Sequence, residues 1–241
     1  MALLFIAVAY RSPKTLQPTM YRKIFFTLIG ITMTTTVIQA QISYGIRNGI
    51  NYAKWEGDDL QIIEDLVDKT EGYVVTKGTR GLHIGGYVRI PISEVFAFEP
   101  GLAYSKKGYS LKGDFQIPVL NAVGINLRAQ VQSHYIDIPL VIKANVYEGL
   151  QVYAGPQVSL LMRSSLNAKL GVLGITIFNK GFGITERFNR ADLGLTGGIG
   201  YEFENGFNVQ AGYEYGLTPL DKRDNYEVYN RVVKVSVGYT F

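Results

Sequence analysis

The sequence predicts an all-β chain, an eight-stranded antiparallel transmembrane β-barrel with short periplasmic turns and long extracellular loops. Three observations predict it. Successive segments alternate apolar and polar side chains with a period of two, as strands with one apolar face do. The connections between these segments are alternately long and short. Glycine and tyrosine are abundant, with 27 and 17 residues, and no stretch after residue 40 is apolar for long enough to form a membrane-spanning helix.

A secretory leader is predicted at residues 20–40. Arg22 and Lys23 form a short positive segment, an apolar run follows, and the stretch ends on the small residue Ala40. This order is typical of a signal peptide, and we expect cleavage after Ala40 rather than a retained anchor. Residues 1–19 are interpreted as a segment upstream of a start at Met20, with a start at Met1 as the alternative. Residues 41–241 then form the barrel domain.

The formal charge of +4 is a property of the leader. Four basic residues and no acidic residue precede position 41, so the rest of the chain has 20 of each. A neutral domain lacks the basic excess that binding to nucleic-acid phosphates requires. The chain has no cysteine, which excludes disulfides, thiolate metal sites and cysteine nucleophiles. The acidic residues at 58–68 lack the spacing of a calcium-binding loop, and we expect no metal and no cofactor.

Eight segments carry the alternation. The predicted strands are about 42–53, 80–90, 95–106, 130–146, 150–162, 190–203, 207–217 and 231–241. The predicted short turns are 91–94, 147–149 and 204–206, and the long loops are 54–79, 107–129, 163–189 and 218–229. Asn205-Gly206 in the third turn is typical of a tight hairpin. An even number of strands, with short turns at one end and long loops at the other, is typical of a transmembrane barrel.

The last predicted strand shows the alternation most clearly. Its apolar face consists of Val233, Val235, Val237, Tyr239 and Phe241. Lys234 lies on the opposite face, among small and polar residues. We expect this strand to pair with the first one, because a closed ring leaves no unpaired backbone edge in lipid.

The inward-facing positions form a predicted polar network in the lumen. Its residues are Arg47, His83, Arg89, Glu99, Asp137, Lys143, Asp192, Glu202, Glu214 and Lys234. The outward positions have almost no charge, which is the reverse of a soluble barrel. Eight strands enclose just enough space for their own side chains, and unpaired buried charges are unfavourable. We therefore expect the network to pair internally and fill the lumen, with Glu99, Glu202 or Glu214 as the partner of Lys234.

The residues leave three functions open. The first is a structural or surface-interaction role, in which extracellular loops contact a protein partner or lipopolysaccharide. Residues 117–127 and 170–182 are apolar for surface loops, and they either extend the hairpins as exposed strand edges or pack on each other. The second is a narrow channel for ions or small solutes. The third is a lipid-modifying enzyme with Ser133 and His134 at the rim, but neighbouring residues of a strand point to opposite faces, so we expect no enzymatic activity.

An ordered series of segments, at 45–51, 81–92, 98–108, 135–140, 154–157, 198–203 and 239–241, resembles the small PorT-like outer-membrane β-barrel proteins. These are similar in architecture to the eight-stranded OmpA and OmpX barrels. The resemblance implies a monomer in the Gram-negative outer membrane, exported through the leader and in contact with outer-membrane lipid and lipopolysaccharide. It also implies insertion by the barrel-assembly machinery, with Tyr239 and Phe241 as the insertion signal, so that deleting Phe241 impairs insertion. One namesake of the family serves a protein-secretion system, and no residue here connects this chain with that role.

Overall fold

The computed structural model describes residues 42–58, 60, 74–116, 124–172, 175–223 and 226–241, which belong to one compact unit, Gln41–Phe241. The predicted leader lies outside the described residues. In the part of the chain that is described, no helix has the length and apolar character needed to cross a membrane.

The described chain consists of antiparallel strands and one short helix. The elements are β1 (Ser43–Glu56), β2 (Val74–Pro91), β3 (Phe96–Gln116), β4 (Gly124–Tyr147), β5 (Leu150–Val172), β6 (Ile175–Gly183), the 3₁₀ helix η1 (Thr185–Arg187), β7 (Ala191–Glu202), β8 (Phe207–Gly216) and β9 (Tyr229–Thr240). Three tight turns join β2 to β3, β4 to β5 and β7 to β8, as predicted. The turn after β7 places Gly206 at a φ of 86°, a left-handed conformation that glycine adopts without strain.

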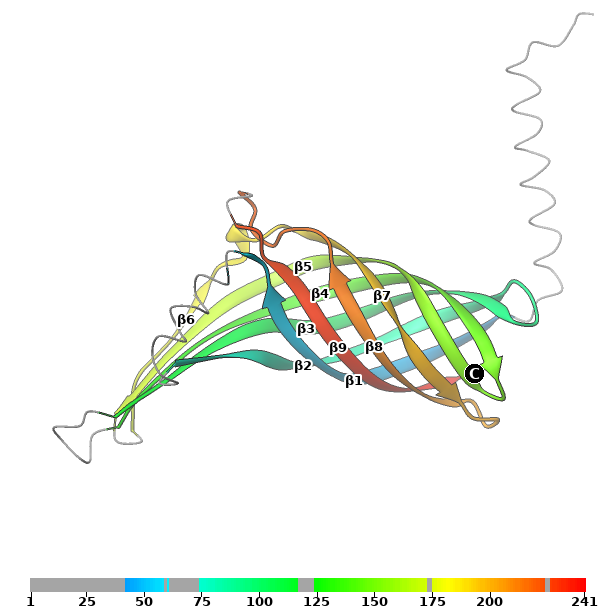
Figure 1. Ribbon diagram of the computed structural model, residues 1–241, viewed down its shortest axis with the longest axis horizontal. Coiled ribbons are helices and arrows are strands. Elements are labelled where there is room, and N and C mark those ends of the chain that lie inside the picture. Colours follow the sequence, from blue (N-terminus) through cyan, green and yellow to red (C-terminus); the bar gives the residue numbers. More distant parts are fainter. Residues whose placement is uncertain (1–41, 59, 61–73, 117–123, 173–174, 224–225) are drawn as a thin grey trace, which may run out of the picture. The chain divides into compact units, whose positions relative to one another are not determined.

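Eight of these strands close into a ring (Figure 1). Each ring strand pairs antiparallel with its neighbours, and β9 pairs with β1, placing Lys234 opposite Asn51. β6 lies outside the ring and pairs with β5 alone among the described strands. The predicted eight-stranded antiparallel barrel is therefore confirmed, with one additional strand attached to it.

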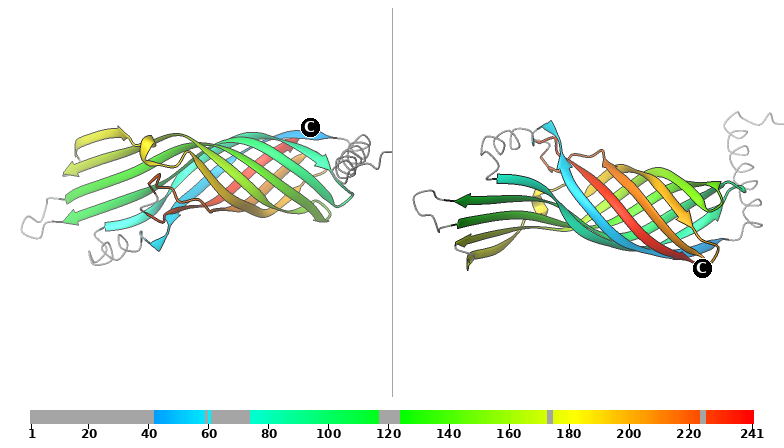
Figure 2. Two further views of the ribbon diagram at one scale, coloured as in Figure 1. Left: turned by 90° about the horizontal axis from the view of Figure 1, so that it is seen from above. Right: turned by 60° about the horizontal axis from the view of Figure 1, so that its bottom comes forward.

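Four of the ring strands, β2 to β5, are longer than predicted. The prediction of loops at 107–129 and 163–189 is wrong, because β3 runs to Gln116, β4 begins at Gly124, β5 runs to Val172 and β6 occupies part of the second range. These strands remain paired beyond the ring, where Arg128 of β4 lies opposite Lys112 of β3 and Lys169 of β5. Backbone pairing does not need an apolar face, so the sheet continues where the hydropathy pattern fades. Figure 2 shows these strands projecting past the ring as a sheet.

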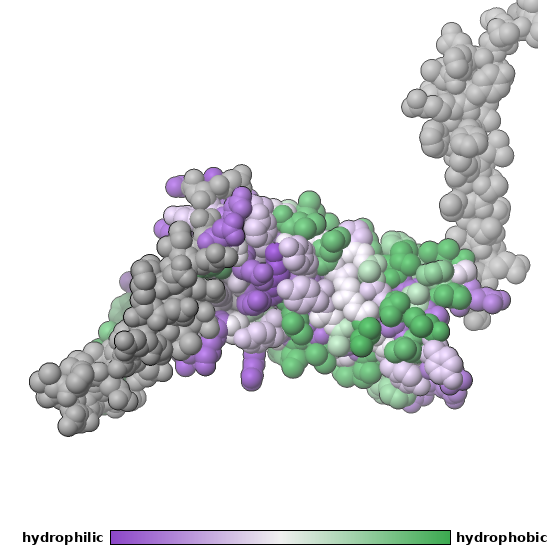
Figure 3. Space-filling view, viewed as in Figure 1, coloured by the Kyte–Doolittle hydropathy of each residue, from purple (hydrophilic) through white to green (hydrophobic). Residues whose placement is uncertain are grey.

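The distribution of side chains is that of a membrane barrel. Apolar residues of the outward face are exposed, among them Leu82 at 65% and Ile199 at 58%. Charged residues of the inward face are buried, including Lys107 at 0% and Asp137 at 1%. A water-soluble barrel would have the opposite arrangement. Figure 3 shows hydrophobic residues on the wall toward the short-turn end, and polar residues gathering toward the long-loop end.

Candidate functional site

A cluster of five charged side chains lies in the lumen toward the short-turn end. This Glu99 group comprises Arg47, Arg89, Glu99, Lys143 and Glu202. Glu99 contacts three cations, with its carboxylate oxygens 2.7 Å from Lys143 Nζ, 3.0 Å from Arg47 Nη2 and 3.2 Å from Arg89 Nε. Arg89 also donates two hydrogen bonds to Glu202, at 2.7 and 2.6 Å. These ion pairs connect side chains from five strands, β1, β2, β3, β4 and β7.

A second cluster lies nearer the long-loop end. This Asp137 group comprises Lys107, Asp137, Glu214 and Lys234, which come from β3, β4, β8 and β9. Lys107 contacts both carboxylates, lying 3.1 Å from Asp137 and donating a hydrogen bond to Glu214. Lys234 also contacts both, at 3.1 Å from Asp137 and 2.7 Å from Glu214. The four charges alternate in sign, so that each has two neighbours of opposite sign.

The second cluster differs from the prediction in two respects. Of the three carboxylates expected to pair with Lys234, Glu214 does so, while Glu99 binds the cations of the other group. Lys107 was placed in a loop, yet it is fully buried and holds two carboxylates. The sequence contains a signal for Lys107, because it lies two residues after the inward-facing Ser105 and so continues the inward alternation of β3.

A cavity of about 80 Å³ separates the two clusters. It is lined by Arg47 and Glu99 from one group and by Asp137 and Lys234 from the other, together with His83. His83 Nδ1 lies 2.7 Å from the side-chain oxygen of Asn51, and the side-chain nitrogen of Asn51 donates to the Ser105 hydroxyl at 2.8 Å. His83 is thus part of a hydrogen-bond chain that joins β2, β1 and β3.

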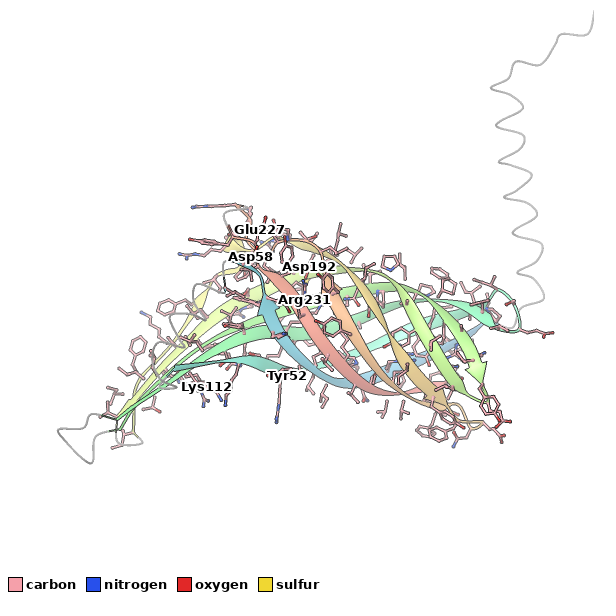
Figure 4. The ribbon with its side chains drawn as sticks, viewed as in Figure 1. Tyr52, Asp58, Lys112, Asp192, Glu227 and Arg231 are labelled. Carbon is pink, nitrogen blue, oxygen red and sulfur yellow. The ribbon has the colours of Figure 1, made fainter. Side chains whose placement is uncertain are left out.

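Asp192, also predicted for the network, is held differently. It is 3% exposed and accepts a hydrogen bond of 2.7 Å from Asn230 of β9. Arg231, the next residue after Asn230, lies at the mouth of the barrel with its guanidinium carbon 3.6 Å from the centre of the Tyr215 ring, and it donates to the backbone oxygen of Gly216 at 2.7 Å (Figure 4). The sequence prediction missed Asn230 and Arg231, because each lies at the edge of a predicted strand.

Aromatic and apolar side chains cover the long-loop end of the lumen. Trp55 of β1 stacks on Tyr109 of β3, with ring centres 5.2 Å apart and planes at 4°. Phe188 packs against the same tryptophan at 5.7 Å, and the nearby Leu220 is 3% exposed. Pairing between Phe188 and Asp221 connects the two segments that carry these residues.

The residues predicted as the insertion signal lie in an aromatic cluster at the short-turn end. The ring of Tyr239 is 5.2 Å from that of Phe207 and 5.1 Å from that of Phe241. The backbone amide of Phe241 donates to the carbonyl of Tyr44 at 2.8 Å, which extends the pairing of β9 with β1. The role of Tyr239 and Phe241 in insertion stays a prediction.

Ser133 and His134 do not form a pair. Ser133 is buried with its hydroxyl 2.9 Å from that of Ser164, whereas His134 Nδ1 lies 2.5 Å from the hydroxyl of Tyr104 on the outer face. The two side chains therefore have separate partners on opposite faces of β4, as the strand geometry requires. Among the described residues, no group of three or more His, Asp or Glu side chains is arranged to hold a metal ion.

A closed ring with an apolar wall and an ion-paired interior defines an integral outer-membrane β-barrel. Residues 38–222 match the family model described as outer membrane protein beta-barrel domain, and the chain belongs to this family.

Solved structures of similar fold were also found. They include Ail, the attachment invasion locus protein of Yersinia pestis, with 17% identity over 83% of this chain and 98% of that chain, and a TM-score of 0.41. Neisserial surface protein A has 14% identity over 82% of this chain and 97% of that chain, with a TM-score of 0.40. The N-terminal barrel domain of Pseudomonas aeruginosa OprF has 13% identity over 84% of this chain and 100% of that chain, with a TM-score of 0.32. Among curated proteins, none matches the chain.

Proposed function

We propose that the protein is an outer-membrane barrel with a filled lumen, which presents an extracellular sheet to a partner protein. The partner contributes an extended segment that adds to the sheet as a further strand. The observation that carries this proposal is β6, a strand that pairs with β5 beyond the ring and has one edge unpaired among the described strands.

The free edge of β6 is suited to strand addition. All nine of its residues are exposed, and Lys180 is its one charged residue. Ile175 is 68% exposed and Ile177 is 60% exposed, although both lie beyond the apolar wall of the barrel. Natural sheets usually protect an exposed edge with charges, proline or a covering segment, because its free N–H and C=O groups attract another chain. An apolar, almost uncharged edge is the form that a strand-binding surface takes.

The interior supports a filled lumen rather than a channel. The Glu99 group and the Asp137 group each consist of side chains from several strands, and the charged atoms within each group are in direct contact. A narrow channel, the alternative from the sequence, would have to pass both groups and the aromatic cover around Trp55. The separate partners of Ser133 and His134 weigh against a lipid-modifying enzyme at the rim.

The remaining expectations are part of the same proposal. The leader directs export and is cleaved after Ala40, the barrel-assembly machinery inserts the chain, and the protein stays monomeric in the membrane. Specific kinship with the PorT-like proteins is retained as the finer family assignment. The ordered segments of the sequence support it, and a role in protein secretion is not included.

Crosslinking from β6 in living cells tests the proposed partner surface. A photo-reactive residue at the exposed Asn179 is expected to form a discrete protein adduct. Adding Ile177→Lys is expected to reduce that adduct about tenfold, because a charge at the edge disfavours pairing by roughly 1.4 kcal/mol.

A probe at Lys222, which is exposed in another extracellular segment, provides the matched control. It should give little adduct, and Ile177→Lys should not change its yield. Equal adducts from both positions, or an Asn179 adduct unaffected by Ile177→Lys, would contradict strand addition at β6.

A further inference from the structure

A concave site on the outer wall, formed by β1 to β4, is lined by four cations. This cation site consists of Lys77, Arg80, Lys112 and Arg128, and it has a volume of about 530 Å³. Tyr52, Gly78, Thr79, Ser110 and Gln130 complete its lining, so none of the described lining residues carries a carboxylate. We propose that the cation site binds the phosphate groups of a glycolipid of the outer leaflet.

The arrangement of the cations calls for an anion. Lys112 lies directly opposite Arg128 on the neighbouring strand, and like charges in that position are destabilising. Lys77 lies opposite Ser110, which is two residues before Lys112. Lys77 is therefore a diagonal neighbour of Lys112. The four cations form no salt bridge within the described ranges, whereas the exposed Lys54 and Arg190 each contact a glutamate. A bound phosphate would give these cations the counter-charge that the described residues do not supply.

A buried hydroxyl group in the lining indicates what binds there. Ser110 is 4% exposed, and its hydroxyl has no hydrogen-bond partner among the described residues. Buried hydroxyls normally find a partner, and an unsatisfied one indicates a missing ligand or water. Phosphate oxygens accept hydrogen bonds from hydroxyls, and arginine guanidinium groups bind them in a bidentate manner. Arg80, Arg128 and the Ser110 hydroxyl therefore match phosphate in both charge and hydrogen bonding.

The position of the site identifies the source of the phosphate as a lipid. Arg80 lies two residues before Leu82 on the outward face of β2, so the site begins where the exposed apolar wall ends. Tyr52 pairs with Arg80 across β1 and β2, and exposed tyrosines of membrane barrels lie at headgroup level. Figure 4 shows Tyr52 and Lys112 on the wall, away from the acidic residues labelled at the mouth. A cation cluster just above the hydrocarbon region faces headgroups of the outer leaflet.

Binding of purified lipid A to the purified full-length barrel in detergent micelles tests the inference. The test variant is Lys112→Gln/Arg128→Gln, checked for folding by its heat-modifiable gel mobility. Wild-type protein is expected to bind fluorescent diphosphoryl lipid A at least about tenfold more tightly than this variant, because each removed cation weakens attraction to an anionic headgroup. Dephosphorylated lipid A is expected to bind wild type and variant equally weakly.

The matched control is Lys180→Gln/Lys222→Gln, which removes the same charge from exposed positions outside the cation site. It should bind lipid A as wild type does. Equal losses of lipid A affinity in the two double variants would mean that only net charge matters, which would overturn a defined site. Unchanged affinity in both variants would overturn it as well. Displacement of lipid A by an equal concentration of inorganic phosphate would overturn the lipid as the ligand.

Discussion

Replacing Lys107 with methionine is expected to lower the free energy of unfolding by about 3–5 kcal/mol, the range for breaking a buried ion pair by removing one partner. Lys107 is fully buried and contacts both Asp137 and Glu214, and the substitution leaves two carboxylates with Lys234 as their one cation in the group. The measurement is urea unfolding in lipid vesicles, followed by heat-modifiable gel mobility.

Two further variants make the result specific to the Asp137 group. Lys107→Met/Glu214→Gln should be more stable than Lys107→Met alone, because it removes one charge of each sign. Lys54→Met disrupts an ion pair in which both side chains are more than half exposed, and it should change stability by less than about 1 kcal/mol. If Lys107→Met and Lys54→Met gave similar small losses, the buried cluster would not have the energetic role assigned to it.

Replacing Glu99 with glutamine should destabilise the barrel by a similar amount, again about 3–5 kcal/mol. Glu99 is 2% exposed and contacts Arg47, Arg89 and Lys143. Without its charge, three cations would share the single carboxylate of Glu202, which already binds Arg89. The same unfolding titration measures the loss, and Glu94→Gln in the exposed first short turn serves as the control.

A second substitution is expected to restore part of that stability. Lys143→Met in the Glu99→Gln background removes a cation that has lost its partner at 2.7 Å. The double variant should therefore be more stable than Glu99→Gln, although it carries one more substitution in the interior. A double variant that is less stable, with losses that simply add, would mean that the two residues do not act as a charge pair.

The alternation of side chains was sufficient to predict the ring and its closure. A strand with one lipid face and one lumen face has a strict period of two, which β9 shows from Val233 to Tyr239. The ends of the strands were not predictable in the same way. Beyond the membrane both faces of β3, β4 and β5 contact water, so the period weakens while the backbone pairing continues. β6 was missed for this reason, whereas Lys107 lies in the lumen and was missed because the predicted strand ended at residue 106.

The partners within the lumen depend on information that the pattern does not contain. Which charges meet is decided by their height along the barrel, and that height follows from the tilt and stagger of the strands. Lys234 reaches Asp137 across the lumen, although the residues are separated by 97 positions in the chain. The cation site has the same origin, because strand pairing brings together residues of β2, β3 and β4 that lie in predicted loops or at their edges.

Single-channel recording in planar bilayers tests the central claim most directly, namely that the two charged groups fill the lumen. Wild-type protein that has inserted, as judged by its heat-modifiable mobility after recovery, is expected to produce no resolved current steps. Steady steps in the wild type whose size or ion selectivity changes with Glu99→Gln or Lys234→Met would place the ion path through these groups and contradict a filled lumen.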